Sequence, residues 1–258
     1  MADSAAESRP PPPLQPGTLY VVATPLGNLE DITLRALRTL RECDVVAAED
    51  TRHTGRLLAH FGIHRPLLSC HGFNEARRTG ELLARLRAGE KVALVSDAGT
   101  PGVSDPGERV VRAALAAGLR VEPVPGPCAA VAALCAGGLP GDEFHFAGFL
   151  PVKSGGRRRE LERLRALPGT LVLYESPHRA EKLLGELAEL LPDRSVVVAR
   201  EITKRFEEWL RGTPTELVAQ TRGRVWKGEC VVLVGPAETR KAAIPHGDAI
   251  REGGAAGE

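Results

Sequence analysis

Short apolar runs alternate with helical patterns through the first half of the chain, and this alternation constrains the fold more than any other feature. Each run is bounded by turn residues and is short enough for a strand buried on both faces. Between the runs, one helix is expected after Asp31, a favourable N-cap, and another over about residues 74–88, ending at Gly89. The runs cover residues 19–23, 45–48, 67–70, 92–95 and 121–124. This alternation predicts a mostly parallel sheet covered by helices.

The pattern changes after Pro140, where strands follow one another more often without an intervening helix. The expected strands there cover residues 144–149, 171–174, 196–199, 207–210 and 230–234. We therefore predict an α/β protein of two domains, with the mostly parallel, helix-covered sheet in residues 17–140 and a smaller mixed-sheet domain in residues 141–236. Residues 1–16, rich in Pro, Ser and Ala, are expected to form a disordered tail, and residues 237–258 a polar tail.

Composition excludes several classes of protein. The formal net charge is +1, so any positive charge that binds nucleic acid must be local. Five cysteines without a Cys-x-x-Cys pair argue against a disulfide framework or a zinc site and suit a cytoplasmic protein. The N-terminus lacks the apolar core of a signal peptide. The uncharged stretch 123–141 holds four prolines and four glycines, so it predicts a loop and a buried helix rather than a membrane span.

The loops that follow the first-half strands hold the candidate ligand site. The first, Thr24-Pro25-Leu26-Gly27-Asn28, is not a Gly-x-Gly-x-x-Gly turn, and no P-loop occurs, so NAD, FAD and P-loop nucleotides are disfavoured. The second, residues 96–107, contains two Asp, three Gly and two Pro, a density typical of loops that approach a ligand closely. There the Asp97 carboxylate is suited to ribose hydroxyls or an amine. The third, residues 123–130, has small side chains suited to a planar ligand. Each loop alone also fits a purely structural turn.

Polar and basic residues gather in the second half. The segments 174–179 and 200–205 end strands with charged residues, and Asp50, Glu175 and Glu201 are candidate acid/base carboxylates. Residues 151–165 hold six basic and two acidic side chains, a net charge of +4. Leu161, Leu164 and Leu167 should face inward from that helix and leave its arginines outward. This basic run is compatible both with phosphate binding and with a helix face that is only solvated.

Together these motifs resemble one family. LYVVATPLGNLEDIT at 19–33, AAEDTRHTGRLL at 47–58, SDAGTP at 96–101, PGPCAA at 125–130, GFLPVKSGGRRR at 148–159, YESPHR at 174–179 and REITK at 200–204 are similar to the small-subunit ribosomal RNA 2′-O-ribose cytidine methyltransferases. That family belongs to the tetrapyrrole methylase superfamily, and the resemblance covers residues 17–235. The Thr-Pro-Leu-Gly-Asn form of the first loop resembles the RNA-modifying branch, because porphyrin-methylating members usually have a Gly-rich loop.

The resemblance implies S-adenosyl-L-methionine bound in the cleft between two domains, a homodimer, and methylation of a cytidine ribose in small-subunit ribosomal RNA or the assembled small ribosomal subunit. The residues implied to line the cofactor pocket are Leu26, Asp97, Gly99, Thr100, Cys128, Ala129 and Tyr174. The alternatives are a tetrapyrrole C-methyltransferase of the same fold and a non-catalytic ribosome-associated binding protein. Family members commonly carry a further helical C-terminal segment, where this chain is expected to have only its polar tail.

Methyl transfer to a ribose hydroxyl needs no metal, but a poor nucleophile needs a group that accepts or steers its proton. Asp50, Glu201 and Lys204 are the catalytic candidates. The candidate RNA-binding residues are basic and lie after strands or at helix starts: Arg52, Lys153, Arg157, Arg158, Arg159, Arg179 and Arg205.

Overall fold

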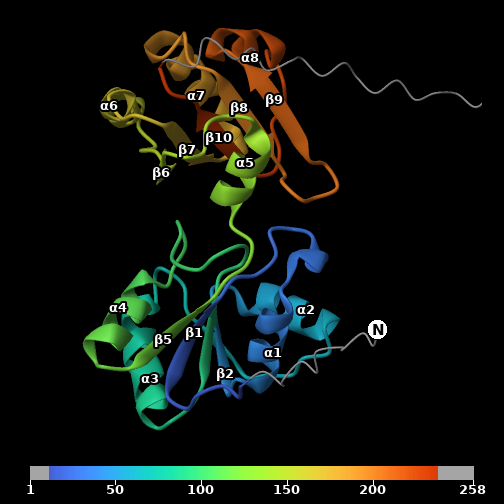
Figure 1. Ribbon diagram of the computed structural model, residues 1–258, viewed down its shortest axis with the longest axis vertical. Coiled ribbons are helices and arrows are strands. Elements are labelled where there is room, and N and C mark those ends of the chain that lie inside the picture. Colours follow the sequence, from blue (N-terminus) through green and yellow to red (C-terminus); the bar gives the residue numbers. More distant parts are fainter. Residues whose placement is uncertain (1–11, 238–258) are drawn as a thin grey trace, which may run out of the picture. The chain divides into compact units, whose positions relative to one another are not determined.

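The computed structural model describes residues 12–237 and divides into two compact units (Figure 1). Among the described residues, the first unit contains residues 12–132 together with Glu201–Glu207, and the second contains residues 133–200 and 208–237. The division falls earlier than the predicted boundary near residues 139–142, inside helix α5 (Ala129–Gly137). The short segment 201–207, which the sequence suggested for the second domain, belongs with the first unit.

The first unit is built on a parallel five-stranded sheet in the order β3-β2-β4-β1-β5. Its strands are β1 (Thr18–Val22), β2 (Val45–Ala48), β3 (Leu67–Ser69), β4 (Val92–Val95) and β5 (Arg120–Val124). Its helices are the 3₁₀ turn η1 (Leu29–Asp31), α1 (Leu34–Glu42), α2 (Thr51–His60), α3 (Glu75–Arg87) and α4 (Glu108–Ala116). The predicted helix-covered parallel sheet is confirmed. Helix α1 begins later than expected because Thr33, not Asp31, is its N-cap: Thr33 Oγ1 accepts a hydrogen bond from the Ala36 amide at 3.0 Å.

Alternate residues of each strand in this sheet pack into different cores. Leu19 joins a cluster with Leu82 and Leu86 of α3, whereas its neighbour Tyr20 joins a cluster with Leu40 of α1. Figure 1 accordingly draws α1 and α2 on one side of the sheet and α3 and α4 on the other. Burial on both faces explains why these strands are continuous apolar runs.

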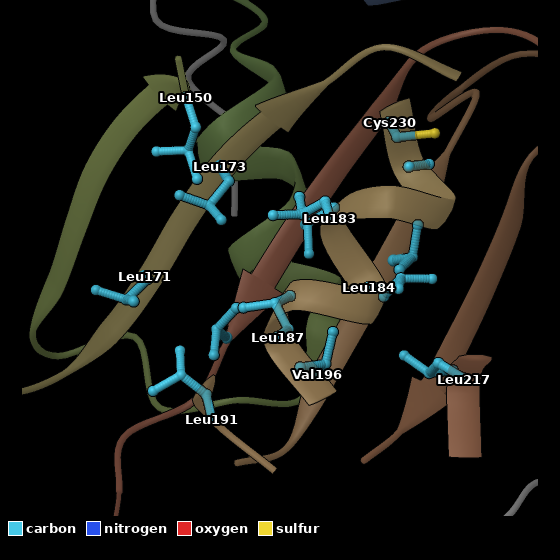
Figure 2. Close-up of a cluster of buried hydrophobic side chains, with 14 of the residues drawn as sticks. Leu150, Leu171, Leu173, Leu183, Leu184, Leu187, Leu191, Val196, Leu217 and Cys230 are labelled. Carbon is cyan, nitrogen blue, oxygen red and sulfur yellow. The ribbon is translucent and has the colours of Figure 1, made fainter. Parts of the chain in front are cut away.

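The second unit contains a mixed sheet, as predicted, and the structure gives it five strands in the order β6-β7-β10-β8-β9. Strands β6 (Phe144–Phe149) and β7 (Thr170–Glu175) pair in parallel, and the other neighbours pair antiparallel. The remaining strands are β8 (Val196–Arg200), β9 (Glu208–Gly212) and β10 (Cys230–Val234), and the remaining helices are α6 (Ser154–Arg165), α7 (Pro177–Leu190) and α8 (Pro214–Gln220). Figure 2 shows the apolar core of this unit, in which Leu183 and Leu187 of α7 lie near strand residues such as Leu171.

Two expectations concern membranes and chain ends. Within residues 12–237, no helix is long and apolar enough to cross a membrane. Most of the predicted tails, residues 1–11 and 238–258, lies outside the described residues. Residues 12–16 are irregular but held in place: the Gln15 amide donates to Tyr20 Oη at 2.7 Å, and Arg38 Nη1 donates to the Pro12 carbonyl at 2.7 Å.

Candidate functional site

The loops after β1, β4 and β5 meet at one edge of the first unit, because the carboxyl ends of parallel strands share an edge. We call residues 23–28, 96–101 and 125–129 the loop cluster. The first two of its loops are joined by a pair of backbone hydrogen bonds, from the Thr24 amide to the Gly99 carbonyl at 2.9 Å and from the Gly99 amide to the Thr24 carbonyl at 3.0 Å. Thr24 Oγ1 also donates to the Ser96 carbonyl at 3.2 Å. These bonds fix the two loops as one surface.

The third loop is tied to the second. Thr100 Oγ1 donates to the Pro127 carbonyl at 3.0 Å. Gly99 has a φ of 78°, and a Cβ there would lie 3.2 Å from Leu26 Cδ2 and 3.6 Å from the Pro127 oxygen. Glycine is therefore required at this point both for its backbone and for the close approach of the loops. The structure thus brings Leu26, Gly99 and Thr100 together, with Cys128 and Ala129 following Pro127 directly.

Asp97 lies in the same cluster, with one carboxylate oxygen already engaged. Its Oδ1 accepts a hydrogen bond from the Asp50 amide at 3.0 Å, which fixes the orientation of the side chain. Its Oδ2 accepts no hydrogen bond from any residue between 12 and 237. A carboxylate held by one oxygen presents the other as an acceptor for a ligand hydroxyl or amine.

Glu49, which the sequence did not single out, supports Asp97 from the end of β2. Its Oε2 accepts a hydrogen bond from the Asp97 amide at 3.3 Å. Burial raises the pKa of the Glu49 carboxyl above its ordinary value. Glu49 stands beside Asp50 at the end of a predicted strand, but nothing in the pattern favours Glu49 over Asp50.

Asp50 also lies at this edge, as the N-cap of α2. Its Oδ1 accepts from the Arg52 amide at 2.8 Å, and its Oδ2 lies 2.8 Å from Arg52 Nη2. Hydrogen bonds from the Arg52 side chain hold the pKa of Asp50 well below its usual range. Asp50 is therefore a weak proton acceptor in this arrangement, and the predicted RNA contact Arg52 is partnered by it while remaining largely exposed.

Glu201 and Lys204, the other catalytic candidates, are brought together in the segment 201–207 of the first unit. Lys204 Nζ lies 2.9 Å from Glu201 Oε1, and both side chains are mostly covered. The Lys204 side chain also lies against Gly27 of the first loop. The structure therefore places these two residues beside the loop cluster.

Tyr174 and Arg179 belong to the second unit. Tyr174 makes edge-to-face contacts with Phe146 and Phe149, at centroid distances of 5.0 and 5.7 Å. Arg179 Nε lies 3.0 Å from Oε1 of Glu175, a carboxyl whose pKa is raised by burial. Arg179 therefore compensates a buried carboxylate in its own unit, and its predicted contact with RNA remains a prediction.

The expectation that the arginines of α6 point outward is wrong for Arg157. Its side chain is 3% exposed and forms an ion pair with Glu186, with Nε at 2.5 Å from Oε2 and Nη2 at 2.7 Å from Oε1. The helix places residue 157 on the same face as Leu161 and Leu164, so its charge is buried and needs a carboxylate partner. By contrast Lys153 and Arg159 are exposed.

Two further basic candidates stand at the surface with partners. Arg158 Nη1 lies 2.6 Å from Oε2 of the exposed Glu189. The Arg205 guanidinium lies over the Phe206 ring, 5.6 Å from its centroid, and both residues are exposed. Exposed ion pairs contribute little to stability, so breaking the Arg158–Glu189 pair in favour of another partner would cost little.

Comparison with known proteins identifies the family. The model of the tetrapyrrole (corrin/porphyrin) methylases matches residues 18–218. A ribosomal RNA small subunit methyltransferase I from Pseudomonas aeruginosa is 53% identical over 223 residues, covering 84% of this chain and 78% of that protein. The protein of the same name from Escherichia coli O157:H7 is 49% identical over 239 residues, covering 91% and 83%. The family resemblance predicted from the motifs is confirmed.

Solved structures share the fold. A uroporphyrin-III C-methyltransferase from Thermus thermophilus superposes with a TM-score of 0.60 at 27% identity, covering 86% of this chain and 95% of that one. A crystal structure of the Thermus enzyme complexed with S-adenosylhomocysteine gives a TM-score of 0.61 at 24% identity, with 85% and 98% covered. On the match over residues 18–218 and these relatives, the chain belongs to the tetrapyrrole (corrin/porphyrin) methylase family.

Proposed function

We propose that this chain transfers a methyl group from S-adenosyl-L-methionine to the 2′-hydroxyl of a cytidine ribose in small-subunit ribosomal RNA, as a cytoplasmic homodimer. The observation that carries the proposal is the loop cluster, in which three loops are tied together around a carboxylate with one oxygen left for a ligand. The identity of about half of all residues to proteins named ribosomal RNA small subunit methyltransferase I supports RNA over a tetrapyrrole as the substrate.

The residues of the loop cluster fit S-adenosyl-L-methionine. The Oδ2 atom of Asp97 suits a ribose hydroxyl or the amino group of the methionine part. Gly99 and Ala129 let a flat ligand approach the backbone, and the Leu26 side chain offers an apolar contact. When bound, the cofactor supplies a methyl group on a positively charged sulfur. On the strength of the motif resemblance, we assign Thr100 and Cys128 to this pocket and propose that Tyr174 also contributes to cofactor binding.

The 2′-hydroxyl must lose its proton as the new bond forms, and the Glu201–Lys204 pair is the better candidate for this task. A protonated lysine cannot accept a proton, so Glu201 is the acceptor of the pair and Lys204 orients it and the substrate oxygen. Asp50 is less suited because its carboxylate already caps α2 and both of its oxygens accept hydrogen bonds from Arg52. Asp50 instead fixes Asp97 through its backbone amide.

Exposed basic side chains provide the charge that an RNA polyanion requires. The residues of this kind that we propose for phosphate contacts are Arg52, Lys153, Arg158, Arg159 and Arg205. Arg179, whose side chain is 18% exposed and paired with Glu175, is proposed as a further contact on the motif resemblance alone. Each neutralised phosphate releases counterions, which gives binding a steep salt dependence. A two-fold pair of chains would double this basic surface, as suits a substrate as large as a ribosomal subunit.

Methyl transfer tests the proposal directly. The protein is incubated with methyl-labelled S-adenosyl-L-methionine and small subunits from a strain that lacks the activity, and the label is mapped to one nucleotide. Subunits reconstituted with a 2′-deoxy nucleotide at that position should accept no label. Continued labelling of the 2′-deoxy RNA would exclude the 2′-hydroxyl as acceptor. Labelling of a porphyrin precursor without labelling of small subunits would favour the tetrapyrrole alternative.

A further inference from the structure

Gly27 of the first loop lies directly under the side chain of Lys204, a residue 177 positions away in the sequence. A Cβ atom at Gly27 would lie 2.8 Å from Lys204 Cε and 2.9 Å from Cδ, and closer still to Cγ. Real Cβ atoms do not approach other carbons so closely. Gly27 is not among the residues with positive φ, so its backbone does not require glycine. What the structure uses at this position is the absence of a side chain.

The segment that carries Lys204 is held in a costly conformation. Glu201 has a φ of 53° and Thr203 a φ of 65°, and a β-branched residue at positive φ is rare. The buried side chain of Ile202 anchors the turn between them. Strain of this kind persists where the surroundings over-determine it, and it gathers at functional sites.

Hydrogen bonds within the segment 201–207 hold its backbone in this conformation. The Lys204 amide donates to the Glu201 carbonyl at 3.0 Å, and the Thr203 amide donates to Glu207 Oε2 at 2.6 Å. The Glu207 amide in turn donates to the Lys204 carbonyl at 3.1 Å. The backbone at Lys204 is thus held by hydrogen bonds on both sides, and its side-chain stem lies against Gly27.

The ammonium group of Lys204 contacts the Glu201 carboxylate. Lys204 Nζ lies 2.9 Å from Glu201 Oε1, and the Glu201 side chain is only 17% exposed. The residue before Gly27, Leu26, reaches Gly99 of the loop cluster. The contact between Gly27 and Lys204 therefore links the Glu201–Lys204 pair to the loop that supports the proposed cofactor pocket.

We infer that Gly27 is a positioning residue for methyl transfer: its bare Cα seats the Lys204 stem, and the seated ammonium group holds the Glu201 carboxylate in place to receive the 2′-hydroxyl proton. This inference rests on the proposed function. In the step it serves, the bond between the 2′-oxygen and the methyl carbon forms as the sulfur–methyl bond breaks. The electron pair of that bond goes to sulfur, and the hydroxyl proton goes to Glu201.

The first test is a double-mutant cycle of Gly27→Ala and Lys204→Ala, read as kcat on small subunits. Each single variant should lose on the order of 10²-fold in kcat, since positioned acid–base groups contribute 10²- to 10⁴-fold. In the Lys204→Ala background, Gly27→Ala should change kcat by less than about two-fold, because no lysine stem is left to displace. The kcat is measured at saturating S-adenosyl-L-methionine, and the Kd for the cofactor is measured for every variant, so that an effect on cofactor binding is separated from the effect on kcat. Gly72→Ala, in an exposed loop of the same unit with open space around it, is the matched control and should retain wild-type kcat.

The cycle separates positioning from a general structural role. A further loss of ten-fold or more when Gly27→Ala is added to Lys204→Ala would overturn the inference, because a structural role does not depend on the lysine. Full activity of Gly27→Ala alone would overturn it as well.

A second test does not depend on the substrate. The rate at which Lys204 is acylated by N-hydroxysuccinimidyl acetate is followed by peptide mass spectrometry in the wild type, Gly27→Ala and Gly72→Ala. Displacement of the stem should raise the rate at Lys204 several-fold in Gly27→Ala and leave it unchanged in Gly72→Ala. An unchanged rate in Gly27→Ala would show that the glycine does not seat the lysine. If the wild type labels no small subunit but this result holds, the proposed substrate fails while the seating of Lys204 stands.

Discussion

The buried ion pair between Arg157 and Glu186 is expected to be a main support of the second unit, and Arg157→Met tests this. The Arg157 side chain is 3% exposed, and two of its guanidinium nitrogens contact the Glu186 carboxylate. In the variant, Glu186 keeps, among residues 12–237, the hydrogen bond from the Ser154 hydroxyl to its Oε1 at 2.7 Å. A buried carboxylate would then lack its counter-charge.

The expected cost follows from that burial. Removing one partner of a buried ion pair destabilises a protein by about 3–5 kcal/mol. Arg158→Met is the matched control, because Arg158 is the next residue of α6 and pairs with the exposed Glu189. Exposed pairs contribute only about 0.2–1 kcal/mol. With a denaturant slope of about 2 kcal/mol per molar urea, the midpoint should fall by roughly 1.5–2.5 M for Arg157→Met and by no more than about 0.5 M for Arg158→Met.

Tryptophan fluorescence during urea unfolding is the assay, because both tryptophans, Trp209 and Trp226, lie in the second unit. Burial alone would raise the pKa of Glu186, but hydrogen bonds from Arg157 and Ser154 hold it below its ordinary value of 4.5. The stability gained from this lowered pKa is present above pH 4.5 and lost as the pH falls through the folded-state pKa. The difference in urea midpoint between the wild type and Arg157→Met should therefore become smaller at acidic pH. Equal midpoints for Arg157→Met and Arg158→Met at neutral pH would refute the reasoning.

Three further predictions follow from the first unit and the basic run. Asp97→Ala should weaken S-adenosyl-L-methionine binding by roughly 10- to 150-fold, from about 1.5–3 kcal/mol of lost hydrogen bonding, and unchanged affinity by calorimetry would remove Asp97 from the proposed pocket. Replacing Arg158 and Arg159 with Gln should flatten the plot of log RNA affinity against log salt by about 0.7–0.9 per lost phosphate contact, and an unaltered slope would mean a merely solvated helix face. Glu49→Gln should stabilise the first unit at neutral pH, because the buried carboxyl has a raised pKa and its charge costs stability above that pKa. Hydrogen exchange of the β4 amides should show that the extra stability of Glu49→Gln over the wild type decreases as the pH falls towards 4.5. Extra stability that persists at pH 4.5 would contradict this explanation.

Much of the fold could be predicted from the sequence because its signals are local. The strands of the first unit are buried on both faces, so each appears as an apolar run between turn residues. The helix predicted over residues 74–88 is α3, Glu75–Arg87, because its apolar spacing and its C-terminal glycine both mark it. The start of α1 was misplaced because two cap residues, Asp31 and Thr33, stand close together, and only the structure shows which one accepts a hydrogen bond from the helix.

Side-chain roles in the candidate site are harder to predict, because a sequence does not show which charged side chains pair or which are buried. The sequence places Arg157 in a basic run expected to face outward, and its buried partner Glu186 lies 29 residues further along. A charge that is buried in the structure has the same sequence signal as one at the surface. The partner of Asp50, by contrast, is only two residues away, but the sequence alone does not show that Arg52 engages its carboxylate.

The segment 201–207 shows most clearly why strand-and-helix patterns cannot complete the site. The segment lies between β8 and β9 of the second unit in sequence, so the pattern assigned it there, yet it packs with the first unit. The determinants of that packing are a side-chain stem lying on a glycine and a turn made by two non-glycine residues at positive φ. None of these leaves a periodic signal. The positive φ values at Glu201 and Thr203 work against local preference, and in such places the surroundings, rather than the local sequence, decide the conformation. The positive φ of Glu201 and the packing of the Lys204 stem on Gly27 both depart from what the local sequence predicts. These are the same two residues that we propose for proton removal.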